Sequence, residues 1–206
     1  IKGMSGMSFS SRDTANAAKI FNEMLSDENC SIFLTIAGST SAGGCMKLYS
    51  DLVKYNMVDA VVATGASIID MDFFEALGFK HYQGSQFQDD TELRKNYIDR
   101  IYDTYIDEEE LQACDQTICD IANSLEARAY TSREFIEELG KFLKKNAKKQ
   151  DSLIETALDN NVASISIRIE SEQIKYTIDK NDEIIDGNKE ISEIIKAVSY
   201  THLTLP

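Results

Sequence analysis

Two loops of small residues in the first third of the chain have the composition of phosphate-binding turns. The first is residues 38–44 (GSTSAGG), and the second is residues 64–67 (TGAS). Such residues let main-chain N–H groups and hydroxyls approach a phosphate at a helix N-terminus. Neither loop has GxGxxG or GxxxxGK[ST] spacing, so each alone is explained equally well as a tight turn between a strand and a helix.

Two carboxylates, Asp70 and Asp72, follow the second loop closely. Beside a nucleotide crevice, a carboxylate can hold an amine or a ribose hydroxyl. The alternative for Asp72 is that it caps the start of the helix predicted from DFFEAL, which Gly78 would end.

The elements needed to position these residues are short apolar runs that alternate with helical patterns. Residues 32–36 and 58–62 are predicted to be buried, neighbouring parallel strands, each closed by one of the two loops. A helix over residues 45–55 would join them in a right-handed βαβ unit. Two loops at adjacent strand ends are what a dinucleotide crevice needs, and together they favour nucleotide binding over simple turns. The helix is predicted to turn four residues inward, namely Met46, Leu48, Leu52 and Val53.

The remaining patterns are mostly helical. Residues 11–25 predict an amphipathic helix capped by Ser11 or Asp13, with an apolar face of Ala17, Ile20, Phe21 and Met24. Residues 89–126 are acidic and helical in pattern, with an apolar stripe of Tyr97, Ile98, Ile101, Tyr102 and Tyr105. Within them, the acidic residues 107–110 indicate a solvated helix start. Residues 132–145, capped at Ser132 and with Phe135, Ile136 and Leu139 on the apolar face, and residues 151–158 are two further helices.

The end of the chain has a different character. Residues 164–197 alternate apolar and polar side chains between turn signals, which is typical of a half-exposed antiparallel hairpin. Residues 198–206 (VSYTHLTLP) correspond to one reading frame of a transposon end used in sequencing adaptors. They are interpreted as an artefact, so His202 is not a candidate site residue.

The amino-acid composition limits the kinds of molecule that this protein is expected to bind. The 206 residues carry a formal net charge of −14, which argues against nucleic acid and suits a cationic substrate, although solubility alone would also explain it. No apolar run is long enough to span a membrane and no secretory signal opens the chain, so a cytoplasmic protein is expected. The four cysteines form no CxxC pair and lie near no histidine, so no metal site is expected.

The stretches CSIFLTIAGSTSAGG, LVKYNMVDAVVATGASIIDMDFFEALGFKHYQGS and RIYDTYIDEEEL resemble the deoxyhypusine synthase family, most closely its bacterial and archaeal deoxyhypusine synthase-like branch. NMVD at residues 56–59, with the loop after it, carries most of this resemblance, which extends from about Gly6 to Ala163. It implies a Rossmann-like fold, a homotetramer, NAD as cofactor and spermidine as aminobutyl donor. The acceptor would be a lysine of the hypusine-bearing translation factor, or a diamine that becomes homospermidine.

The resemblance also implies site residues. NAD-contacting positions fall at Gly38, Ser39, Thr40, Ser41, Ala42, Thr64, Gly65 and Ala66. The family's polyamine-contacting Glu-Glu pair falls near Asp70, where this sequence has one extra residue and has aspartates in place of glutamates. In the first loop, Ala37-Gly38-Ser39 replaces the family's Thr-Ser-Asn.

The family's nucleophilic lysine and the tryptophan beside it match no position here. The chain is therefore expected to be an inactive N-terminal fragment, with residues 1–163 as a truncated NAD-binding region and no assignable catalytic residue. A divergent insertion after Ala163 is the alternative to a junction with unrelated sequence. The competing functional hypothesis is a non-catalytic nucleotide-binding or assembly module on the same fold.

Overall fold

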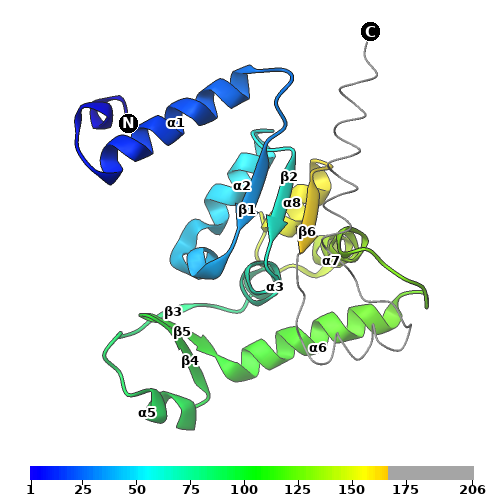
Figure 1. The fold of residues 1–206 in the computed structure, drawn as a ribbon. Helices are drawn as coiled ribbons and strands as arrows, with labels where there is room; N and C mark the ends of the chain where they lie inside the picture. Colours follow the sequence, from blue (N-terminus) through cyan, green and yellow to red (C-terminus); the bar gives the residue numbers. More distant parts are fainter. Residues whose placement is uncertain (167–206) are drawn as a thin grey trace.

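A three-stranded parallel sheet lies at the centre of the computed structural model, which describes residues 1–166 (Figure 1). Its strand order is β1-β2-β6, with β1 at Phe33–Ile36, β2 at Ala60–Ala63 and β6 at Ala163–Ser166. Both neighbouring pairs are parallel. The predicted pair of neighbouring parallel strands is therefore confirmed, and the chain has the mixed α/β architecture expected of it.

The two predicted strands differ in burial. All four residues of β2 are buried, because strands pair with it on both sides. Strand β1 lies at an edge of the described sheet, and only Ile36 among its residues is fully buried. The prediction that both strands are buried is thus correct for β2 and only partly correct for β1.

Strand β6 corrects the expectation of an antiparallel hairpin at residues 164–166. Alternating apolar and polar residues indicate a strand, but strand direction depends on the connection. Here helix α8 (Leu153–Asp159) returns the chain across the sheet, so β6 enters parallel to β2. The hairpin predicted for residues 167–197 and the adaptor-derived segment 198–206 lie outside the described residues.

Helix α2 (Met46–Lys54) crosses from β1 to β2, after the short helical turns η2 (Gly38–Thr40) and η3 (Ser41–Cys45). It buries Met46, Ser50 and Val53, which follow each other at helical spacing. Leu48 was predicted to point inward but is 62% exposed. It lies about 200° around the helix from Met46, so the two side chains cannot share a face.

A continuous helical segment follows β2. It comprises α3 (Gly65–Ser67), η4 (Ile68–Phe73) and α4 (Phe74–Ala76). Ile68, Phe73 and Phe74 are fully buried in the core. Gly78 ends the segment with φ +95°, as predicted from its position.

A small antiparallel sheet interrupts the helix predicted for residues 89–126, which is helical only over residues 90–95 and 108–124. Strands β3 (Tyr82–Gln83), β5 (Thr104–Asp107) and β4 (Ile98–Ile101) pair in that order, with α5 (Asp90–Lys95) before β4. Tyr97 and Tyr102 both have positive φ, which interrupts any helix. Both rings are exposed, so the predicted apolar stripe does not exist.

The other two long helices follow the prediction more closely. Helix α6 (Glu108–Ser124) begins at Asp107, whose carboxylate accepts hydrogen bonds from the N–H groups of Glu109 and Glu110, which confirms the acidic helix start. Helix α7 (Ser132–Asn146) buries Phe135, Ile136 and Leu139 as expected. Its cap is Thr131 in a capping box with Glu134, one residue before the predicted Ser132.

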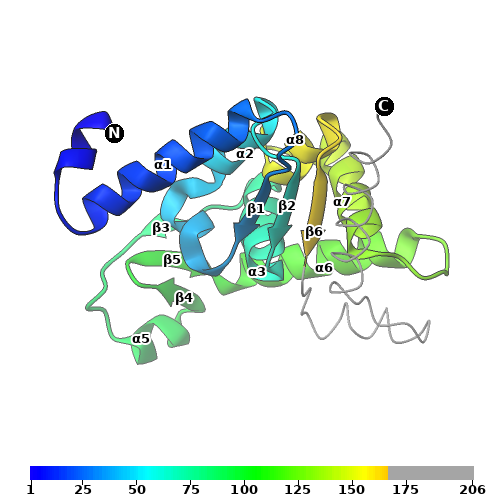
Figure 2. The same cartoon turned by 45° about the horizontal axis from the view of Figure 1, so that its top comes forward.

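The N-terminal helix α1 (Ser10–Ser26), preceded by η1 (Lys2–Gly6), extends away from the sheet (Figure 2). Its N-cap position is Phe9, with no side-chain cap, so neither Ser11 nor Asp13 has the predicted role. Only Ala15 is buried, and Ile20 is 57% exposed. The predicted apolar face is thus only partly covered, by contacts of Phe21 and Met24 with the core. No helix within residues 1–166 is long and apolar enough to cross a membrane.

Candidate cofactor and amine site

The two small-residue loops lie side by side where strands β1 and β2 end (Figure 1). The N–H of Thr64 donates to the carbonyl of Ile36 at 3.2 Å. The hydroxyl of Ser67 donates to the carbonyl of Gly38 at 3.4 Å and lies 3.1 Å from the hydroxyl of Thr64. The predicted neighbourhood of the loops is therefore confirmed, whereas cofactor binding there stays a prediction.

The first loop is open above its main chain. Gly38 and Gly44 have φ of +70° and +86°, which side chains other than glycine rarely adopt. A Cβ built at Gly38, Gly43 or Gly44 would meet nothing within 4 Å. The phenol of Tyr49 on α2 donates to the hydroxyl of Thr40 at 2.9 Å, which ties the loop to the crossover helix. The geometry leaves room for a ligand to approach the main chain.

A cleft of about 420 Å³ begins at these loops and extends to the small sheet. This volume lies within the usual range for small-molecule sites. Its lining includes Gly38 and Ala66 from the two loops, Asp70, and Asp99 and Arg100 from the small sheet.

Asp70 is the half-buried acid of this cleft. Burial, together with the smaller effect of the negative charge of Asp115 on α6, raises the pKa of its carboxyl to about 6. A carboxylate in this state lacks a compensating cation, and an ammonium group of a ligand would supply one.

Asp99 on β4 is a second acid of the cleft, and sequence reasoning missed it because residues 97–107 were predicted to be helical. A hydrogen bond with Glu108 raises the pKa of Asp99 to about 6 and lowers the pKa of Glu108. Neighbouring Arg100 does not neutralise these acids, since its guanidinium donates to both carboxylate oxygens of Asp90 at 2.7 and 3.0 Å. Recognition of the β4–β5 pair would have revealed this site. It was missed because the sequence does not show that Tyr97 and Tyr102 have positive φ.

Asp72, the other predicted substrate-binding residue, lines no part of this cleft. Its side chain is buried, and its two oxygens accept hydrogen bonds from the N–H groups of Leu153 and Ile154 at 2.8 and 2.9 Å. It therefore caps a helix, but that helix is α8 rather than its own. Burial raises the pKa of Asp72 to about 7, although the two amide hydrogen bonds oppose this rise.

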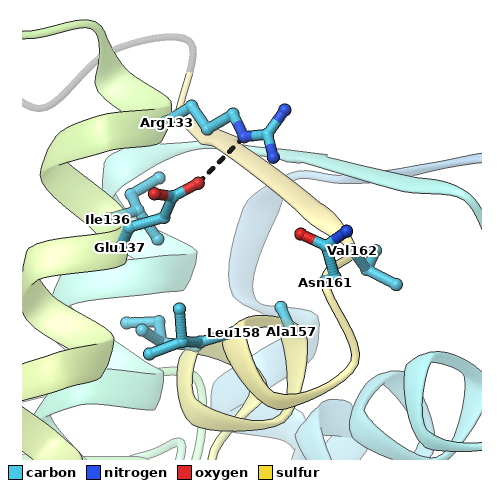
Figure 3. A pocket seen from close by; sticks show the side chains of 8 residues that line it. Arg133, Ile136, Glu137, Ala157, Leu158, Asn161 and Val162 are labelled. Carbon is cyan, nitrogen blue, oxygen red and sulfur yellow. Dashed lines mark hydrogen bonds and ion pairs between the residues drawn. The ribbon is translucent and has the colours of Figure 1, made fainter. Parts of the chain in front are cut away.

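A separate hollow of about 100 Å³ lies between α7, α8 and the residues that lead into β6 (Figure 3). The Nε of Arg133 donates to Glu137 at 3.0 Å above it, and Ile154 and Ala157 form part of its wall. No predicted site residue lines it. Within residues 1–166, no group of three or more histidine, cysteine or acidic side chains is arranged to hold a metal.

The lysines of the described chain are all exposed, including Lys144, Lys145, Lys148 and Lys149. An exposed lysine lacks the apolar surroundings that favour the neutral amine, so it is a poor nucleophile. No lysine lines the cleft.

Comparison with known proteins identifies the family. The family model described as deoxyhypusine synthase matches residues 1–168, which is most of the chain. The chain belongs to the deoxyhypusine synthase family. A deoxyhypusine synthase-like protein of Coxiella burnetii is 68% identical over 79% of this chain and 46% of its own length. A protein of Methanosarcina acetivorans named "probable deoxyhypusine synthase 2" is 32% identical over 98% of this chain and 60% of its own length.

The deoxyhypusine synthase fold is also found by structural comparison. The crystal structure of an assigned deoxyhypusine synthase from Entamoeba histolytica superposes with a TM-score of 0.63. The match covers 94% of this chain and 68% of that one, at 16% sequence identity, and so it bears on the fold alone. The chain spans about half the length of the bacterial relative it matches.

Proposed function

We propose that this chain is the cofactor- and amine-binding part of an NAD-dependent transferase that moves the aminobutyl group of spermidine to an acceptor amine. One observation carries the proposal: the two loops, tied together where the parallel strands end, open into the same cleft as Asp70. Parallel α/β sheets bind nucleotides at such crevices. The acceptor would be a lysine of the hypusine-bearing translation factor or a free diamine, and we propose a cytoplasmic homotetramer as the intact form.

The residues present fit the cofactor. The open main chain at Gly38 and Gly43 leaves room for a pyrophosphate, and Ala66 of the second loop lines the same cleft as Gly38. We propose that Thr64 and Gly65, which precede Ala66, contact the same cofactor. Bound NAD would accept a hydride from the polyamine. The hydroxyl of Thr40 and the main chain of Ser39, Ser41 and Ala42 complete the proposed contacts of the first loop.

The acids fit the amine. Spermidine carries its positive charge on separated ammonium groups, and Asp70 and Asp99 present two carboxyl groups from different walls of the cleft. Asp70 is placed to hold and orient one ammonium. We leave Asp72 out of the proposed contacts because its oxygens are occupied by the amides of α8.

Gly43→Asp tests the cofactor site. The substituted side chain has space, so the fold should persist, but its negative charge would face the pyrophosphate. We expect NAD affinity to fall by about tenfold or more, which corresponds to roughly 1.4 kcal/mol. Gly43→Asn, which has the same shape without the charge, is the matched control and should lose much less. Equal NAD affinity of the Asp and Asn variants in calorimetric titrations would refute the placement of the pyrophosphate.

The exposure of the lysines makes a second prediction. The 206-residue chain incubated with NAD and radiolabelled spermidine should form no labelled product with an acceptor, because capture of the imine needs a lysine that is partly neutral. The no-protein reaction is the control. Turnover above that control would show that one of these lysines is a nucleophile after all. NAD binding without turnover in the intact protein would instead favour a non-catalytic nucleotide-binding module.

A further inference from the structure

A buried hydroxyl, Ser67, joins the two loops of the cleft. Its side chain is 1% exposed, although it lies only one residue beyond Ala66, which lines the cleft. Its hydroxyl is within hydrogen-bonding distance of both the Gly38 carbonyl and the Thr64 hydroxyl. Its side chain therefore contacts both loops at once.

The direction of these two hydrogen bonds follows from their chemistry. A carbonyl oxygen can only accept, so the single hydroxyl hydrogen of Ser67 goes to Gly38. The contact between Ser67 and Thr64 must therefore use the hydroxyl hydrogen of Thr64. The Thr64 side chain makes no helix-capping hydrogen bond that would compete for this geometry.

The consequence concerns what Thr64 can bind. With its hydrogen committed to Ser67, the Thr64 oxygen has only lone pairs to offer a ligand. A phosphate oxygen, which near neutral pH is mainly an acceptor, gains nothing from it. A ligand hydroxyl or amide N–H, such as a ribose hydroxyl or a carboxamide, gains a hydrogen bond.

We infer that Ser67 is a positioning residue that holds Gly38 in place and fixes Thr64 as a hydrogen-bond acceptor, so that the second loop recognises a donor group of the dinucleotide and not its phosphates. The inference rests on the proposed NAD site and deepens it. Phosphate recognition is then left to the main chain of the first loop, where the glycines leave it open.

The test is an NMR titration of the ¹⁵N-labelled 206-residue chain, which detects weak binding, with NAD and with inorganic pyrophosphate as probes. Thr64→Val keeps the shape and removes the hydroxyl. We expect it to weaken NAD binding about fivefold to tenfold, the effect of one hydrogen bond, and to leave pyrophosphate binding unchanged. A merely structural role for Thr64 would weaken both ligands together, and that result would overturn the inference.

Ser67→Ala should also weaken NAD binding about fivefold. The double variant with Thr64→Val should lose much less NAD affinity than the product of the two single effects, because the two residues act through one chain of hydrogen bonds. Ser67→Cys, which keeps a weak donor of similar size, should be intermediate. If the losses are fully additive, or if the Ser67→Ala chain binds NAD as tightly as the parent chain, the inference about Ser67 fails while the proposed NAD site stands. If the parent chain shows no shift with NAD, the proposed NAD site fails, and the inference fails with it.

Discussion

Replacement of Asp72 by alanine is expected to lower the free energy of unfolding by about 3 kcal/mol at pH 5, because two buried N–H groups lose their acceptor. These are the amides of Leu153 and Ile154 at the start of α8. The hydroxyl of Ser152, the capping side chain of α8, already accepts a hydrogen bond from the next amide, that of Glu155, so it is not free to substitute. The loss would be measured by urea denaturation.

The pH dependence of this loss has a definite sign. The pKa of Asp72 is about 7 in the fold and about 3.9 in the unfolded chain, so the parent protein loses stability as pH rises between these values. The alanine variant lacks that titration, so the difference between the two proteins should narrow from pH 5 to pH 8. Asp89→Ala, at the exposed cap of α5, is the matched control and should cost no more than about 1 kcal/mol. A difference that widens with pH would contradict the raised pKa.

Replacement of Asp70 by asparagine is expected to stabilise the fold while it removes amine binding. The pKa of Asp70 is raised to about 6, mainly by burial, from about 3.9 in the unfolded chain. Ionisation of Asp70 therefore costs stability as pH rises from about 4 through 6, and asparagine avoids that cost. We expect the variant to be more stable by on the order of 2 kcal/mol at pH 7.5 and little changed at pH 4.

Amine binding should follow the same titration. A carboxyl group with a pKa of about 6 is roughly one-tenth ionised at pH 5 and nine-tenths ionised at pH 7, so spermidine affinity should rise up to about tenfold over this range. Asp70→Asn should abolish the rise. Asp115→Asn is a second test. Removal of the Asp115 charge lowers the pKa of Asp70, so the rise in spermidine affinity should occur at lower pH. Spermidine affinity that is unchanged in the asparagine variant would remove Asp70 from the site.

The sequence by itself determined the parallel βαβ unit, the two loops that close its strands and the family. Those features depend on local composition: apolar runs predict buried strands, and small residues after them predict open turns. The starts of α6 and α7 were also readable to within a residue, because their caps are side chains of the same turn.

Only the tertiary structure decided the direction of β6, the small sheet and the roles of the two aspartates. Tyr97 and Tyr102 belong to a pattern of apolar residues with the period of a helix, but their positive φ values reverse the chain and bring Asp99 to the cleft. Asp70 and Asp72 are two residues apart and indistinguishable in the sequence. They differ because Asp70 points to the cleft while Asp72 meets the amides of α8, more than eighty residues later in the chain. A contact between such distant segments leaves no local pattern, and so it could be found only once the helices were packed.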